Sequence, residues 1–274
     1  MWSLSSRIGL CGVIAALSAP AHALSVTVTP AEHRVQMDAG STETRSLAVT
    51  NNGAGEITIS AYAWDWWYKA DGSHQFGPPG TLERSGSTWV SMVPEKLVIA
   101  PGTTGHFEVH VSMPDRTTGG YYAVAFLEAR SGTPWSEGFG MRPGARVAVP
   151  MLMEASGTPT HEMSLLDAEV TPPSDTQPLT ISLKSRNSGD THEFPEFMGA
   201  IRSIDNQEIV ARFRGKPTRM LPGQERIIEA SWSGGLPPGS YEVIGSLVYG
   251  GGKNAFVQEQ FTVDYSDAVS DWAP

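Results

Sequence analysis

Few side chains in this sequence stand at spacings that could support chemistry, and the histidines are the clearest of them. His106 and His110 are four residues apart, which on a helix would bring both rings to one metal ion. They lie instead in an alternating run that predicts a strand, where they would be about 13 Å apart and too distant to share a metal. The pairs His161-Glu162 and His192-Glu193 are isolated. We therefore expect no metal site.

The motifs of common catalytic sites are also missing from the sequence. It contains no Gly-x-Ser-x-Gly elbow, no His-Glu-x-x-His pair, no glycine-rich phosphate loop and no calcium-type series of aspartates. The formal net charge of −10 offers no basic excess to displace counterions from phosphates, which disfavours nucleic-acid binding. The sequence predicts a protein that is not an enzyme and has no cofactor.

The densest group of distinctive side chains is the run Trp64-Asp65-Trp66-Trp67-Tyr68. Alternate side chains of a strand point to opposite faces, so Trp66 is expected in the core of a sandwich and Trp67 on the other face. With Trp135, from the loop at 130–144, Trp67 would form a patch that stacks sugars or binds protein. The alternative, which we favour, is that this loop packs against the sheet.

The elements that must position these residues are short β-strands. Apolar and polar side chains alternate in runs separated by Gly, Pro, Asn or Asp, the pattern of strands with one buried face. No window of a dozen residues keeps an apolar stripe at helical spacing without a Gly or Pro. The clearest alternating runs are 24–28, 46–50, 57–60, 106–111 and 145–149. We expect an all-β fold of the sandwich type.

One plan of turns and strands occurs twice. Gly119-Gly120-Tyr121-Tyr122 and Gly239-Ser240-Tyr241 each place a tyrosine after a glycine turn and before an apolar strand. This is the setting of a tyrosine corner, in which the phenol hydroxyl bonds to the loop entering a late strand of an immunoglobulin-like sandwich. A Pro-Gly turn and an alternating strand precede each of them. The repeat predicts two tandem immunoglobulin-like β-sandwich domains.

The N-terminal 23 residues are typical of a signal peptide. They carry Arg7, an apolar run at 8–17 and the triplet Ala-His-Ala before a cleavage point after Ala23. The apolar run is too short to span a bilayer, and no later stretch is long enough either. The only cysteine, Cys11, lies within this run, so lipid anchoring and disulfides are not expected. We expect export to the periplasm or, alternatively, to the cell surface or medium.

The exported chain is expected to have three parts. A first immunoglobulin-like domain spans residues 24–156 and a second, immunoglobulin- or fibronectin-like, spans 160–265, with the boundary in the short segment 155–161. Residues 266–274 form an acidic, aperiodic tail. Removal of Arg7 with the signal would make the net charge −11.

The first half of the chain resembles the PapD-like periplasmic chaperones of the chaperone-usher pathway. The likeness covers residues 24–155 and lies in the order of its motifs: Arg34-Val35 to Gly40, Leu47 to Asn52, Trp66 to Gly72, Val93-Pro94 with Leu97, and Pro101-Gly102. The resemblance implies a chaperone for pilus or fimbrium biogenesis that lends a strand to a secreted pilin-like subunit and works with an outer-membrane usher. Such donor-strand complementation is a form of β-augmentation, in which main-chain bonds hold the client.

By position, the lent strand is 145–153. Its alternation points Val147, Val149 and Met151 one way, with Met153 in the same row. Under the resemblance this row enters the open groove of the client; alternatively it completes the core of the first domain, as any sandwich requires. Pro150 has no backbone N–H to donate to a neighbouring strand, so it is tolerated mainly on an edge strand or at a β-bulge.

Arg34 matches the arginine with which this family holds the carboxylate at the C-terminus of its client. A guanidinium suits that role because its fork of donors pairs both carboxylate oxygens. The family's partner lysine falls at Ala148, and Arg146 lies on the same face as a substitute. A solvated strand-end arginine is the alternative for Arg34.

The second half has no close match to the smaller second domain of pilus chaperones. A diverged family member, or a chaperone-like protein recruited to another assembly, therefore fits better than a typical one. The competing hypothesis is a non-catalytic structural or adhesive protein of the cell envelope, with two immunoglobulin-like binding modules.

Overall fold

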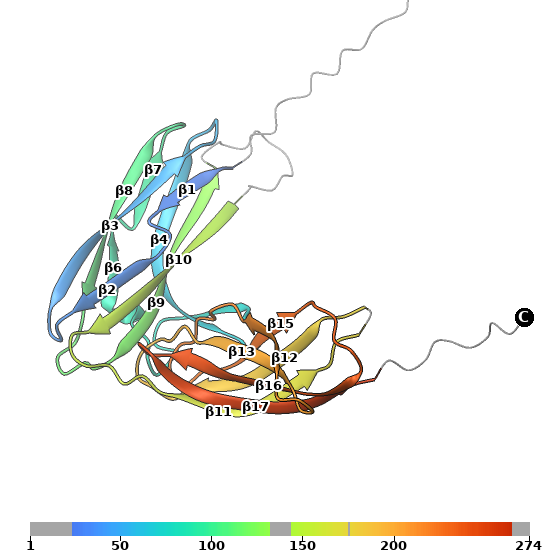
Figure 1. The fold of residues 1–274 in the computed structure, drawn as a ribbon. Helices are drawn as coiled ribbons and strands as arrows, with labels where there is room; N and C mark the ends of the chain where they lie inside the picture. Colours follow the sequence, from blue (N-terminus) through green and yellow to red (C-terminus); the bar gives the residue numbers. More distant parts are fainter. Residues whose placement is uncertain (1–23, 132–143, 175, 265–274) are drawn as a thin grey trace, which may run out of the picture.

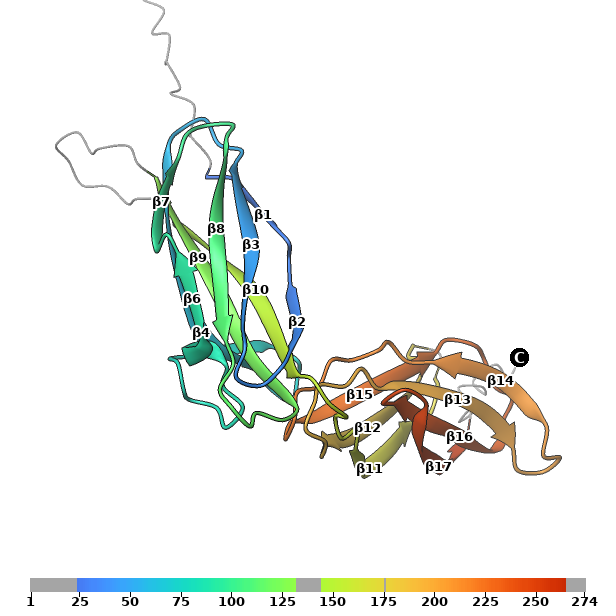
Figure 2. The same ribbon diagram turned by 90° about the vertical axis from the view of Figure 1, so that its left-hand side faces the viewer.

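The computed structural model describes residues 24–131, 144–174 and 176–264, and its regular structure is almost wholly β-strand. Figure 1 shows two bodies that meet near their ends at an angle, with β1–β10 in one and β11–β17 in the other. Each body is a pair of sheets packed face to face (Figure 2). The prediction of an all-β chain with two tandem immunoglobulin-like sandwiches is confirmed.

The first sandwich consists of two sheets. One has the strand order β1-β3-β8-β6; the other has the order β2-β10-β9-β4-β5, with β7 added to β4. Its elements are β1 (Val26–Thr29), β2 (His33–Met37), β3 (Thr42–Asn51), β4 (Ile57–Tyr68), β5 (His74–Gly77), a 3-10 turn η1 (Ser87–Trp89), β6 (Val90–Val93), β7 (Lys96–Ile99), β8 (Thr104–Ser112), β9 (Gly120–Ser131) and β10 (Gly144–Ala155).

The second sandwich pairs a sheet of order β11-β12-β15 with one of order β14-β13-β16-β17. Its strands are β11 (Met163–Thr171), β12 (Leu179–Asn187), β13 (Glu196–Ser203), β14 (Ile209–Arg214), β15 (Glu225–Trp232), β16 (Gly239–Tyr249) and β17 (Lys253–Val263). β10 therefore ends at Ala155 and the next strand begins at Met163.

Each sandwich has its own core, filled by the alternating apolar side chains of the facing sheets. Leu47, Phe107 and Leu127 lie at the centre of the first core, and Phe197 and Val243 at that of the second. All five are fully buried. The alternating runs found in the sequence all lie within or overlap strands of the structure.

Trp66 is fully buried, but the prediction that it belongs to the core of the sandwich is wrong. It lies on the outer face of its sheet, in a separate cluster with Tyr122, Phe126 and Leu152. Leu221 of the second sandwich completes this cluster, so the second domain covers Trp66. The inner face of the same strand end carries Asp65 instead.

The buried Asp65 carboxylate organises the loop after β5. It accepts hydrogen bonds from the hydroxyl of Ser85 at 2.6 Å, from Ser87, and from the backbone N–H of Leu82 at 2.8 Å. Trp67, on the same face of β4 as Asp65 and opposite to Trp66, is half-buried, and its ring lies against Gly77 of β5. Trp135 and most of the loop at 130–144 lie outside the described residues, so the patch with Trp135 and the packing of that loop against the sheet both stay predictions.

The predicted tyrosine corner is present in the second sandwich. The hydroxyl of Tyr241 donates to the carbonyl of Pro237 at 2.9 Å. In the first sandwich, neither tyrosine of the described segment makes the equivalent bond: Tyr121 packs on Trp89 with ring centroids 4.4 Å apart, and Tyr122 faces the second domain. The corner prediction for the first half is therefore wrong.

Candidate functional site

An open length of strand edge lies on β10. β1 pairs with β3 in one sheet, and after residues 30–32 the chain crosses to the other sheet, where β2 pairs in parallel with Met151–Ala155 of β10. β9 covers the opposite edge of β10 along its length. Among the described residues, the edge at 144–150 therefore has no partner strand. Such an edge presents unpaired N–H and C=O groups that can bind another strand.

Pro150 stands where this open edge ends, directly before the residue at which pairing with β2 begins. A proline costs a strand least at an edge, because a missing ladder donor is not needed there. The position agrees with the edge location that the sequence suggested.

The side chains of β10 divide between the two faces of its sheet. Val149 and Met151 are buried in the first core, and Val147 packs against that core while half-buried at the strand end. The row thus completes the core of the first domain in this structure. Arg146 and Ala148 point to the outer face, where the guanidinium of Arg146 lies 4.3 Å from the ring centroid of Phe126.

Arg34 lies on the outer face of β2, beside the place where the open edge stops. In the register of the sheet it stands opposite Leu152. Its Nε bonds to Oε1 of Glu32 at 2.7 Å, and 63% of its side chain is exposed. This arginine is therefore placed in the angle between the two domains and remains accessible to a ligand.

A second arginine reaches the same carboxylate from the other domain. Arg219, in the loop between β14 and β15, bonds through Nη2 to Oε2 of Glu32 at 2.6 Å. Both guanidinium groups lie over the ring of Phe194, Arg34 at 5.6 Å and Arg219 at 5.1 Å from its centroid. The Glu32 carboxylate thus pairs with two guanidinium groups over the ring of Phe194, and the cluster of the three charged side chains has a net charge of +1.

The electrostatics of this cluster follow from its composition. Partial burial raises the pKa of Glu32, but the hydrogen bonds and charges of Arg34 and Arg219 outweigh it and hold that pKa below its usual value. His192, next to Phe194 in the interface, has its pKa lowered by burial. At neutral pH the carboxylate is charged and the imidazole is not, so the cluster keeps its excess positive charge.

Short hydrogen bonds hold the two domains together at this interface. The N–H of Gly120 donates to the carbonyl of Asp190 at 2.7 Å, and the hydroxyl of Thr191 donates to Glu154 at 2.7 Å. A Cβ at Gly119, whose φ is +72°, would lie 2.5 Å from the same carbonyl of Asp190. The close approach therefore needs a glycine there for both space and backbone conformation.

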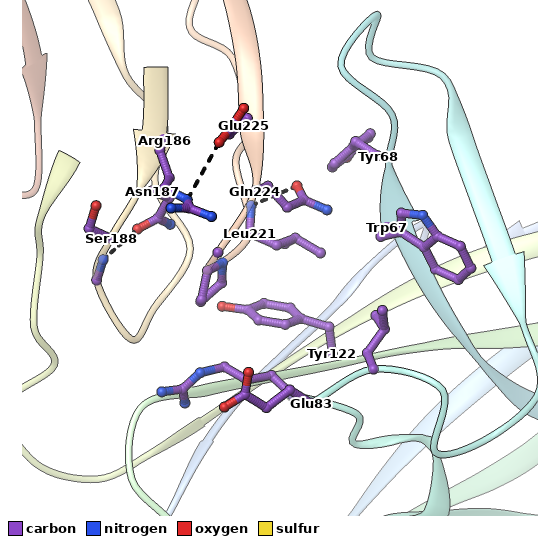
Figure 3. Close-up of a pocket in the computed structure, with 15 residues that line it drawn as sticks. Trp67, Tyr68, Glu83, Tyr122, Arg186, Asn187, Ser188, Leu221, Gln224 and Glu225 are labelled. Atoms are coloured by element: carbon purple, nitrogen blue, oxygen red, sulfur yellow. Dashed lines mark hydrogen bonds and ion pairs between the residues drawn. The ribbon is translucent and has the colours of Figure 1, made fainter. Parts of the chain in front are cut away.

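A pocket of about 580 Å³ lies at the β4 end of the domain interface. Figure 3 shows Trp67, Tyr68 and Tyr122 of the first domain facing Asn187, Ser188 and Gln224 of the second across it. Arg34 and Arg219 do not line it. The ion pair of Arg186 with Glu225 links two strands of the second domain at its wall.

Arg34 and the strand of Val147 were predicted from the sequence, whereas Glu32, Phe194 and Arg219, which the structure brings next to Arg34, were not. The last two come from loops of the second domain, and Glu32 from the crossing between β1 and β2. Loops have no periodicity that would mark such residues, and their meeting depends on the angle between domains. In the described ranges, no group of three or more His, Cys, Asp or Glu could hold a metal, and no helix could cross a membrane.

No protein-family model matches the chain, and no curated protein sequence does. Solved structures match it at low identity. A chaperone–tip adhesin complex of CFA/I fimbriae biogenesis matches with 10% identity and a TM-score of 0.46, over 86% of this chain and 98% of that one. The YadV chaperone matches with 8% identity and a TM-score of 0.43, over 86% of this chain and 99% of that one. The class 5 fimbriae chaperone CfaA matches with 11% identity and a TM-score of 0.43, over 86% of this chain and 98% of that one.

These three structures are chaperone structures, the class of protein that the first half of the sequence resembles. With identities this low and TM-scores below 0.5, they leave the function to be decided by the geometry of the chain itself.

Proposed function

We propose that this protein is an exported, periplasmic assembly chaperone that binds secreted pilin-type subunits by β-strand addition. The observation that carries the proposal is the open edge at 144–150 of β10, which ends beside Arg34. Strand addition needs an exposed edge for main-chain bonds, and a specific site is gained when the end of the added strand is also recognised.

The direction of the client strand follows from β2. β2 runs parallel to β10 and begins at His33, opposite Met151. A client strand laid parallel along 144–150 would lie end to end with β2, and its C-terminus would meet the Glu32–Arg34 segment. The arginines there suit a carboxylate and not an ammonium group, which favours the parallel direction over the antiparallel one.

In this proposal Arg219 supplies the second cation of the carboxylate site. Ala148 occupies the position at which the resembled family has its lysine, and the side chain of Arg146 is turned to Phe126. Arg219 shares Glu32 and Phe194 with Arg34 and comes from the second domain. A client C-terminus would exchange with Glu32 for bidentate bonds to one or both guanidinium groups.

The inward row of β10 gives the client its apolar contacts. Val147, half-buried at the strand end, would contact the client directly. Val149 and Met151 continue the same row between the sheets, along the gap that the crossing from β1 to β2 leaves. Arg146, on the outer face, would contact client side chains that point away from the core.

Co-purification with a secreted pilin-type subunit tests the proposal. Arg34→Ala and Arg219→Ala should each reduce the recovered subunit severalfold, because each removes a carboxylate donor. Arg45→Ala is the matched control, since Arg45 also pairs with a glutamate two residues away but lies on the opposite sheet. Equal recovery in all three variants, with the thermal midpoint unchanged, would exclude the proposed carboxylate site.

A second candidate function is an envelope structural or adhesive module, and one observation favours it. The outer face of β4, β5 and β9 carries aromatic rings in mutual contact, three of them partly exposed: Tyr62, Trp64 and Phe76 around the buried Phe126. Aromatic faces of this kind stack sugars and bind protein. Loss of surface attachment in Trp64→Ala, with subunit recovery unchanged, would favour this function over the chaperone.

A further inference from the structure

An apolar groove of about 740 Å³ lies on the outer face of the second sandwich, and Glu32, Arg34 and Arg219 do not line it. It runs across β14, β13, β16 and β17, the sheet whose inner face covers the second core. Its lining includes Met198, Ala200, Ile244, Val248 and Phe256. In the register of the sheet, Met198, Ser246 and Phe256 form one row and Ala200, Ile244 and Gln258 the next.

The groove exposes several large apolar side chains. Phe256 is 65% exposed and Met198 43%, and Ile209 and Val210 of the edge strand β14 are also exposed. Contiguous apolar surface on a sheet face marks a place where something else binds. No described segment of the chain covers it.

Two positive charges stand at one rim of this groove. Arg212 and Arg214 of β14 are exposed and line it. Arg214 has a weak ion pair with Glu196, with Nε 3.4 Å from Oε1, while no ion pair of Arg212 is present among the described residues. An occupant should therefore combine aromatic or aliphatic side chains with negative charge.

We propose that residues 265–274, which follow β17, occupy this groove. The segment reads Tyr-Ser-Asp-Ala-Val-Ser-Asp-Trp-Ala-Pro and so offers Trp272 for the apolar floor, and Asp267 and Asp271 for the arginine rim. Its composition matches the groove in both respects.

The length of the segment also matches. β17 ends at Val263, and Phe256 lies seven residues back along that strand, a distance of about 23 Å. A chain that reverses over residues 264–266 and runs back extended over the sheet covers about 20 Å in six residues. This brings Trp272 to Phe256, at the β17 end of the row that Ser246, Met198 and Arg214 continue across the sheet.

A second copy of this chain fits the same groove less well. A twofold contact places the same patch of both molecules together. It would bring Arg212 and Arg214 of the two copies to one interface with no carboxylate of the groove lining to oppose them. The acidic segment brings the opposite charge, and it is tethered to the sheet it would cover.

A cysteine cross-link tests this docking in the full exported chain, which has no cysteine of its own after residue 11. Ser246→Cys with Ala273→Cys should form a disulfide at the mass of one chain, because Ser246 lies between Met198 and Phe256 in the groove and Ala273 follows Trp272. The control pair is Val98→Cys with Ala273→Cys, since Val98 is exposed on the first sandwich. The disulfide should form severalfold faster in the groove pair than in the control pair. Adding Arg212→Glu and Arg214→Glu to the groove pair should lower its rate of disulfide formation towards that of the control pair.

Three results would overturn the proposal. They are equal rates in the groove pair and the control pair, a disulfide found only between two chains, or a groove-pair rate that charge reversal at Arg212 and Arg214 leaves unchanged. The cross-link involves no client, so its outcome is independent of the proposed chaperone function. As a second measurement, Trp272→Ala should increase the binding of an apolar fluorescent dye, and Met198→Asp should abolish that increase.

Discussion

Glu32 is the central residue of the arginine cluster between the domains, because its one carboxylate pairs with both Arg34 and Arg219. The pair with Arg219 is well shielded, with 18% of the arginine side chain exposed, whereas that with Arg34 is open to solvent. Ion pairs on the surface contribute little to the free energy of unfolding, and partly buried ion pairs contribute more. Glu32 therefore serves the packing of the domains and also competes with any carboxylate that enters the cleft.

Glu32→Gln should lower stability and strengthen the binding of a client C-terminus. The loss of stability should be about 1–2 kcal/mol, since a shielded charge-assisted pair is lost. Binding should tighten because both arginines lose their internal competitor. Denaturant titration and calorimetry with a client peptide, carrying a free or an amidated C-terminus, measure the two effects. Weaker binding of the free carboxylate in this variant would contradict the role given to the cleft.

His33 makes stability depend on pH. It lies on the buried face of β2, and burial, with a further contribution from the charge of Arg45, lowers its pKa. Below about pH 6.5 the unfolded chain binds a proton that the folded chain resists. Stability should therefore be full above that pH and fall as the pH drops through it.

The thermal midpoint measured between about pH 7.5 and 5.5 should fall less in His33→Leu than in the wild type. His106→Leu is the control, because His106 is exposed on β8. An identical pH dependence in wild type and His33→Leu would show that other groups control it.

At the scale of elements, the Tyr241 corner fixes the entry to β16. Its hydroxyl bond to Pro237 is one neutral hydrogen bond, so Tyr241→Phe should cost about 1 kcal/mol of unfolding free energy. Tyr121→Phe should cost clearly less, because the Tyr121 hydroxyl makes no such bond to its loop. Denaturant titration of both variants decides the matter, and equal losses would argue against the corner.

The strands could be predicted from the sequence because period-two alternation reports directly on one buried face. Trp66 shows the limit of that signal. Its strand is buried on both faces at this point, because Leu221 of the second domain covers the outer face. Alternation alone cannot distinguish a face in the core of the sandwich from a face buried by another domain. The same limit applies to Val149 and Met151, because their alternation would look the same whether the row fills the core of the first domain or the groove of a client.

At the scale of the whole molecule, the site exists because two domains meet at a particular angle. Arg34 could be proposed from its strand and from the resemblance, but Arg219 and Phe194 meet it only when the loops of the second domain are docked. The bonds of Gly120 to Asp190 and of Thr191 to Glu154 set that docking. No short-range pattern in the sequence encodes it, and under the proposed function the lysine expected at Ala148 is replaced from a distant loop.

Hydrogen exchange of the β10 backbone tests strand addition most directly. On binding a pilin-type subunit, the amides at 144–149 should become protected, because the unpaired groups among them gain partners at the edge that β2 leaves open. Amides of β17, on the second sandwich, should keep their free-state rates. Protection along 144–149 that is lost in Arg34→Ala is the predicted result. Binding that protects the aromatic face of β4 and β5 and leaves 144–149 unchanged would contradict strand addition.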